Sequence, residues 1–294
     1  MEVVPAAFRA IHESLTTLSP IQSERNKLLV GWDSRDDGDF HLDGFLCVDE
    51  HSTIEWIAAQ NLIHERILRD SRTVKYSELR PSAVRTQQAL APTLESAGNL
   101  KGVLVVVATD KAYLREDGII LRKSISNEDW IKLTHTWTEN QLDRALRISI
   151  LHSIICSRVS SQGTNIDTLL DEDEIVQKEG QGKDLAKIMD FFIQQVSPHK
   201  LGTCRVTRDK HEPHGKDFTT IADLAVGATF EYLKEVKSQA WPIKIDWATR
   251  PQKSKFIADW WKVDGQPLQK ILLLANREES GSYTAQQLKL SPSA

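Results

Sequence analysis

The sequence predicts an α/β protein in which helices pack on a β-sheet, and two segments carry most of this prediction. Residues 102–108 read Gly-Val-Leu-Val-Val-Val-Ala, a continuous run that is typical of a strand buried on both faces. Residues 139–160 contain no glycine or proline and space their apolar side chains as a core-facing helix does. Strand-like and helix-like segments alternate along the remaining chain, which favours a sheet flanked by helices.

Besides the strand over 102–108, the N-terminal half is predicted to contain a β-hairpin, two further strands and three helices. Residues 27–33 form a short apolar run that ends in Asp33, and a polar turn separates it from a partly alternating run over 40–48. This order of apolar run, Asp/Gly turn and second run is the signature of a hairpin. The other elements expected in this half are helices over 5–19, 52–70 and 82–97 and strands over 74–79 and 119–125.

The C-terminal half continues the alternation and then changes character. A strand is expected over 166–170, a helix over 183–196 and a strand over 201–207. Thr219 or Thr220 can cap a further helix that runs to about residue 239. We therefore assign residues 1–240 to one domain and treat 241–294 as a Trp-rich C-terminal extension with a frayed tail.

Composition indicates an ordinary globular protein. The chain has 294 residues, of which 40% are hydrophobic and 27% charged. No apolar run approaches the roughly 20 residues that span a bilayer, and the N-terminus lacks a basic segment followed by an apolar one. Three cysteines, far apart in sequence, suit a reducing compartment. We expect a cytoplasmic protein with no membrane partner.

The net charge of −4 provides no global attraction for nucleic acid. Non-specific nucleic-acid binders usually carry a basic excess. A polyanionic substrate would therefore depend on local lysine and arginine residues, on a metal ion or on a partner subunit.

Asp223 is the only ionisable residue in the apolar stretch 221–230. A helix that is apolar nearly all round is expected to be buried, and an unpaired buried carboxylate costs several kcal/mol. Gly227, one turn later, leaves room beside it. The alternative is a carboxylate near a helix N-terminus that backbone amides satisfy.

Asp171 and Asp33 each end an apolar strand. For Asp171 the alternative is a solvated acidic turn over 171–174, and for Asp33 it is a polar hairpin turn. A calcium loop starting at Asp33 is excluded because Gly44 stands where a glutamate is needed. Taken together, the three carboxylates predict a site for Mg²⁺ or Mn²⁺, and two such ions about 4 Å apart can activate water and stabilise the leaving oxygen of a phosphodiester.

Four passages resemble the bacterial family known as domain of unknown function 3800, of the ribonuclease H-like superfamily. They lie between residues 26 and 236 and are Gly31-Trp-Asp-Ser34 with the following strand to Val48, Val74-Lys-Tyr-Ser77, Leu169-Leu-Asp-Glu172, and Thr220-Ile-Ala-Asp-Leu-Ala-Val-Gly-Ala228. The last passage is the most specific. The resemblance implies a ribonuclease H-like mixed sheet flanked by helices, a metal-dependent acidic site and nuclease activity.

Residue by residue, the resemblance implies that Asp33, Asp171 and Asp223 are metal ligands and catalytic residues and that Lys75 faces the site. Two departures from the family pattern concern its acids. Ser34 stands where the family has a glutamate, and Arg72-Thr73 stands where an acid often precedes the lysine passage. Glu172 or Glu78 is a candidate to replace the missing acid, and we count Glu172 among the metal ligands.

Other interpretations stay beside this one. Lys75 contacts a scissile phosphate or is an ordinary surface lysine. The basic stretch 205–216 tracks a phosphate backbone, with His211 or His214 in proton transfer, or is a solvated loop. Zinc held by Cys204 and these histidines is disfavoured because no Cys-x-x-Cys and no fourth ligand occur.

Two hypotheses about function follow. The preferred one is a nuclease that cleaves DNA or RNA with two Mg²⁺ or Mn²⁺ ions. In the other, the chain is a ribonuclease H-like scaffold without catalysis, a binding subunit of a larger assembly, possibly one of defence. The missing family acid, the negative charge and the Trp-rich C-terminal region, which offers a surface for a protein partner, favour the second.

Overall fold

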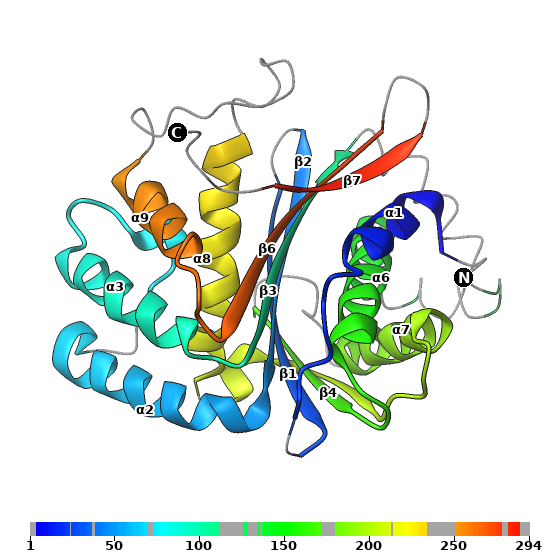
Figure 1. Ribbon diagram of the computed structural model, residues 1–294, viewed down its shortest axis with the longest axis horizontal. Coiled ribbons are helices and arrows are strands. Elements are labelled where there is room, and N and C mark those ends of the chain that lie inside the picture. The colour runs from blue at the N-terminus through cyan, green and yellow to red at the C-terminus, as the bar shows by residue number, and fades with distance from the viewer. Residues whose placement is uncertain are drawn as a thin grey trace.

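A computed structural model gives the architecture of the chain (Figure 1). The structure describes residues 4–23, 25–36, 39–69, 73–111, 126, 128, 135, 137–171, 180–212, 214–233, 251–277 and 282–288.

A seven-stranded mixed sheet forms the centre of the described chain, with strand order β5-β4-β1-β2-β3-β6-β7. The strands are β1 Lys27–Asp36, β2 Phe40–Asp49, β3 Gly102–Asp110, β4 Asn165–Leu170, β5 Cys204–Arg208, β6 Leu268–Arg277 and β7 Tyr283–Leu288. Strands β4 and β5 run parallel to β1, whereas β2 is antiparallel to both β1 and β3. The predicted hairpin and the α/β class are confirmed.

Seven α-helices of the described chain cover the two faces of this sheet, as Figure 1 shows. Helices α2, α3, α8 and α9 lie on one face and α1, α6 and α7 on the other. Their bounds are α1 Ala6–Ser14, α2 Thr53–Ile63, α3 Val84–Gly98, α6 Glu139–Val159, α7 Gln181–Val196, α8 Gly215–Leu233 and α9 Gln252–Trp261. None of them is long and apolar enough to cross a membrane.

The sheet separates two apolar cores. Strand β3 supplies both, because its alternate side chains enter opposite cores: Val105 packs with the α6 side and Val106 with the α8 side. Helix α6 is capped by Thr138, whose hydroxyl accepts from the Gln141 N–H. The predicted burial of β3 on both faces is confirmed, and so is the predicted core-facing helix over 139–160.

Three predicted elements differ from the structure. Residues 74–79 do not form a strand; Tyr76–Glu78 is a 3₁₀-helix instead. Helix α8 begins at Gly215, and the hydroxyls of Thr219 and Thr220 donate to the Lys216 carbonyl inside the helix rather than capping it. The α-helix predicted over 5–19 ends at Ser14. The predicted strand over 119–125 and the end of the helix after residue 233 lie outside the described residues.

The region 241–294 adds structure to the same sheet where it is described. Strand β6 pairs in parallel with β3, and β7 pairs with β6. Helix α9 packs in the apolar core of the α8 face, where Trp260 and Trp261 are buried. The sequence had predicted no strand in this region.

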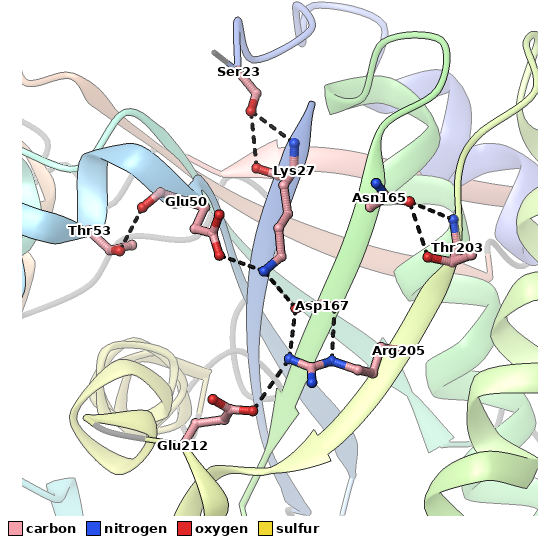
Figure 2. Close-up of polar contacts among 9 residues, drawn as sticks. All are labelled: Ser23, Lys27, Glu50, Thr53, Asn165, Asp167, Thr203, Arg205 and Glu212. Carbon is pink, nitrogen blue, oxygen red and sulfur yellow. Dashed lines mark hydrogen bonds and ion pairs between the residues drawn. The ribbon is translucent and has the colours of Figure 1, made fainter. Parts of the chain in front are cut away.

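An ion-pair network ties the parallel strands β1, β4 and β5 together (Figure 2). Asp167 on β4 accepts from Lys27 of β1 at 3.0 Å and from Arg205 of β5 at 2.9 Å. Lys27 also contacts Glu50, and Arg205 contacts Glu212. Each pair is partly exposed and contributes at most about 1 kcal/mol.

Candidate functional site

The register of three parallel strands brings three carboxylates to one level of the sheet. Trp32 of β1 pairs with Leu170 of β4, which pairs with Arg208 of β5. The next residue on each chain is an aspartate: Asp33, Asp171 and Asp209. Residues paired across parallel strands point to the same face, so these three side chains are neighbours.

These carboxylates lie on the sheet face that α8 covers. Leu169, two residues before Asp171, packs in the same apolar core as the α8 residues. The residue opposite Asp33 on β2 is Gly44. A methyl group there would lie 2.7 Å from the Val226 Cγ2 and 3.2 Å from the Ala222 carbonyl oxygen, so only glycine allows the helix to approach this closely.

This close approach brings Asp223 of α8 next to Asp33. The two carboxyl groups interact with each other; Asp33 is buried and Asp223 is partly buried. Burial raises the pKa of Asp33 well above its usual range, and the charges of Asp223 and Asp171 raise it further. Burial also raises the pKa of Asp223, against the opposing effects of the Tyr76 N–H and the Lys75 charge. Two adjacent buried carboxyls therefore favour sharing a proton or a cation.

Tyr76 fixes the position of the Asp223 carboxylate. Its backbone N–H donates to the Asp223 Oδ2 at 2.5 Å. Its ring lies against Gly227 of α8, where a methyl group would lie 2.2 Å from the Tyr76 Cγ. The Tyr76 hydroxyl is 2.6 Å from the Ser254 Oγ of α9. This ring occupies the room that the sequence predicted beside Gly227. The alternative, in which the N-terminal amides of its own helix hold the Asp223 carboxylate, does not apply, because α8 begins eight residues before Asp223.

Lys75 reaches the same carboxylates from the segment before the 3₁₀-helix. Its Nζ donates to the Asp171 Oδ2 at 2.9 Å. Burial lowers the pKa of Lys75, but the hydrogen bond to Asp171 and the charges of Asp171, Asp223 and Asp33 outweigh it and raise the pKa overall. The structure thus brings together Lys75, Asp33, Asp171 and Asp223, while Glu172 lies outside the described residues.

Asp209 belongs to the same group and was not predicted. It begins a 3₁₀-helix directly after β5, is 1% exposed, and accepts from the Thr219 hydroxyl at 3.1 Å. Its Oδ1 is buried and has no hydrogen-bond partner among the described residues. Burial and then the charge of Asp171 raise the pKa of Asp209. The signal was present in the sequence, because Asp209 follows its strand just as Asp171 follows β4.

Ser34, which stands where the resembling pattern has a glutamate, faces away from these acids. Ser34 alternates with Asp33 along β1 and therefore points to the α6 face. There it hydrogen-bonds the Arg144 guanidinium. On the same face Arg147 lies 3.3 Å from the fully buried Asp43. An acid at position 34 would reach this arginine pair rather than Asp33, so its loss removes no ligand from the α8 face.

The described residues contain no group of three or more His, Cys, Asp or Glu side chains already arranged to hold a metal ion. Asp33 and Asp223 are a pair, and Asp171 is held by Lys75. The zinc alternative gains nothing: His214 contacts Asp217 at 3.1 Å, and burial raises the pKa of Cys204 to about 12. Of the two candidates for the missing acid, Glu78 is exposed.

The sequence was compared with models of known protein families and with curated proteins, and neither comparison found a match.

Proposed function

We propose that this chain is a metal-dependent nuclease that hydrolyses the phosphodiester bonds of DNA or RNA on a ribonuclease H-like sheet. The observation that carries the proposal is the alignment of Asp33, inside β1, with Asp171 and Asp209, which directly follow β4 and β5, and the packing of Asp223 above Asp33. Carboxyl groups whose pKa values are raised by burial and by one another are typical of functional sites.

The strand order supports the ribonuclease H-like part of the proposal. Strands β1, β2 and β3 form an antiparallel meander, and β4 and β5 continue the sheet in parallel on the other side of β1. This arrangement agrees with the mixed sheet flanked by helices that the resemblance implies. Strands β6 and β7 then extend the sheet beyond β3.

The residues present fit a divalent cation in their chemistry. All four acids offer hard carboxylate oxygens, which Mg²⁺ and Mn²⁺ prefer. The proton that Asp33 and Asp223 favour sharing is one that a cation would replace. A third ligand requires the Asp171 carboxylate to turn from Lys75, or Asp209 to use its unpartnered oxygen.

Each residue then has a role in the proposed reaction. Asp33 and Asp223 would bind the cation together, with Asp171 as a further ligand. A bound divalent ion supplies charge neutralisation at the scissile phosphate and lowers the pKa of an attacking water. Lys75, released from Asp171, would hold a phosphate oxygen as a point charge. Tyr76 would keep Asp223 in place through its N–H.

Cleavage assays with matched aspartate variants test this proposal. Labelled single- and double-stranded DNA and RNA are incubated with Mg²⁺, Mn²⁺ or EDTA. We expect metal-dependent cleavage that Asp223→Asn and Asp33→Asn each reduce by more than about 100-fold, since even the loss of a partner of a ligand costs about 10- to 100-fold. Asp167→Asn is the control, because Asp167 lies on the same face of β4 but is occupied by Lys27 and Arg205. Cleavage that survives in folded Asp223→Asn protein refutes the proposal.

One observation favours the second candidate, a binding subunit without catalysis. The ammonium of Lys75 already sits on Asp171, where it provides part of the positive charge that a metal ion would otherwise bring. In that case the same assays would give nucleic-acid binding with no cleavage under any metal condition, and the aspartate variants would not change the binding.

A further inference from the structure

Arg35 is a cation at the edge of the acidic site that is held by aromatic rings. It follows Asp33 by two residues on β1, so both point to the α8 face. Its Cζ lies 3.9 Å from the centroid of the Phe230 ring of α8 and 6.0 Å from that of Tyr76. The two rings hold the guanidinium in position, and the side chain remains partly exposed to solvent.

Lys253 of α9 is a second cation on the same tyrosine. Its Nζ lies 4.0 Å from the centroid of the Tyr76 ring and donates to the Tyr76 carbonyl oxygen at 2.8 Å. Burial lowers the pKa of Lys253, the charges of Glu231 and Asp223 raise it, and the charge of Arg35 lowers it. Lys253 therefore lies within electrostatic reach of both Arg35 and Asp223.

Neither cation forms an ion pair with any residue in the part of the chain that the structure describes. Other basic residues on this sheet face do: Lys27 and Arg205 pair with Asp167, and Lys75 pairs with Asp171. Arg35 and Lys253 are instead oriented by neutral groups, the two rings and one carbonyl. Their positive charge is thus available to an anion that arrives beside the carboxylates.

We propose that Arg35 and Lys253 form a phosphate-binding subsite for the phosphate next to the scissile one. This inference rests on the proposed nuclease function and specifies its substrate as a nucleic-acid strand with at least two consecutive phosphates. Two residues along a strand span about 7 Å, which places Arg35 roughly one nucleotide away from Asp33. Lys253 belongs to the C-terminal region, so this region would complete the binding surface.

Binding measurements at several salt concentrations test the subsite. The probes are labelled 12-nucleotide single strands of DNA and RNA, with Ca²⁺ in place of Mg²⁺ and intact probe verified on a gel. We expect Arg35→Gln and Lys253→Gln each to weaken binding about three- to tenfold at 0.1 M salt. The slope of log K against log salt should fall by about 0.7 for each lost phosphate contact. Arg35→Lys should retain the slope, which separates lost charge from lost packing on Phe230.

The matched controls are Lys255→Gln on the same helix and Arg25→Gln, an exposed arginine at the opposite end of β1. A second readout uses a dinucleotide with a single phosphodiester. The double variant that combines Arg35→Gln with Lys253→Gln should have a lower kcat/KM than wild type on the 12-mer. It should keep the wild-type kcat/KM on the dinucleotide, which has no neighbouring phosphate.

Each outcome decides between the two proposals. Wild-type protein that cleaves while the double variant binds with an unchanged salt slope refutes the subsite and leaves the nuclease function intact. Loss of kcat/KM on both substrates by the same factor also refutes it, because the two cations would then serve the scissile phosphate itself. Wild-type protein that neither binds nor cleaves any probe refutes both.

Discussion

Gly227→Ala is the substitution that best tests how the site is held together. A methyl group at this position would lie 2.2 Å from the Cγ and 2.4 Å from the Cδ1 of the Tyr76 ring. These are rigid ring atoms, and the Tyr76 hydroxyl is anchored to Ser254 at 2.6 Å. The ring must therefore move, and with it the backbone N–H that holds Asp223.

The size of the effect follows from three opposing contributions. Alanine in a helix interior is favoured over glycine by about 1 kcal/mol. Overpacking a buried contact costs about 1–3 kcal/mol. Loss of a hydrogen bond to a charged group, here from Tyr76 to Asp223, costs about 1.5–3 kcal/mol more. We expect a net loss of about 1.5–5 kcal/mol in the free energy of unfolding, together with loss of metal-dependent cleavage.

Urea unfolding of single and double variants measures this loss. In a Tyr76→Ala background the ring is gone, so Gly227→Ala should be neutral or stabilising by about 1 kcal/mol. Gly98→Ala is the control in α3, because a methyl group there meets only the flexible end of the Gln266 side chain. If Gly227→Ala costs the same with and without the Tyr76 ring, the reasoning about this contact is wrong.

Three further predictions concern the charges of the site. The raised pKa of Asp33 means that its protonated form stabilises the folded state below the ordinary value of 3.8, and that this stability is lost as pH rises through the folded pKa. The free energy of urea unfolding in EDTA should therefore depend less on pH for Asp33→Asn than for wild type, and this variant should be the more stable of the two at pH 8. Identical pH profiles would contradict this. Mn²⁺ should raise the melting temperature more at pH 8 than at pH 5, because it competes with the proton that Asp33 and Asp223 favour sharing, and a shift independent of pH would count against a carboxylate site. Lys75→Gln should tighten Mn²⁺ binding in calorimetry while it slows cleavage, because Asp171 loses its internal cation; weaker binding would show that Lys75 does not compete with the metal.

The strand ends of the candidate site were predictable because they depend on local patterns. Asp33 and Asp171 each follow an apolar run, and parallel pairing with matched register is enough to make them neighbours, although β1 continues past Asp33 to Asp36. Asp223 was predictable for a different reason: a single acid in an apolar helix must find a partner in the core. In each case the local sequence shows a carboxylate beside apolar residues, which must find a partner when the chain folds.

The segment around Lys75 was not predictable as structure. Val74, Tyr76 and Leu79 are all buried, which resembles the pattern of a short strand. Its backbone, however, pairs with no strand of the described chain, and the Tyr76 N–H donates to Asp223 instead. A long-range contact decided the conformation against the local propensity.

The role of Lys253 could not be predicted from the local sequence, because the Tyr76 carbonyl that it contacts is 177 residues away along the chain. Nothing in the pattern of α9 distinguishes Lys253 from Lys255. What separates them is that Ser254 faces the Tyr76 hydroxyl, and this orients the helix. Side chains supplied by distant elements are thus the part of a site that periodicity does not indicate.

The charge balance of the site supports the proposal that it binds a cation. Four carboxyl groups, those of Asp33, Asp171, Asp209 and Asp223, act on one another, whereas among the described residues Lys75 alone forms an ion pair with any of them. One ammonium neutralises one carboxylate and leaves three. Without a bound ion, burial forces protons onto the others, as the raised pKa values of Asp33, Asp209 and Asp223 indicate. A purely structural cluster would be more stable with amides at these positions, so the presence of four acids supports the proposal of a site that exchanges protons for a divalent ion.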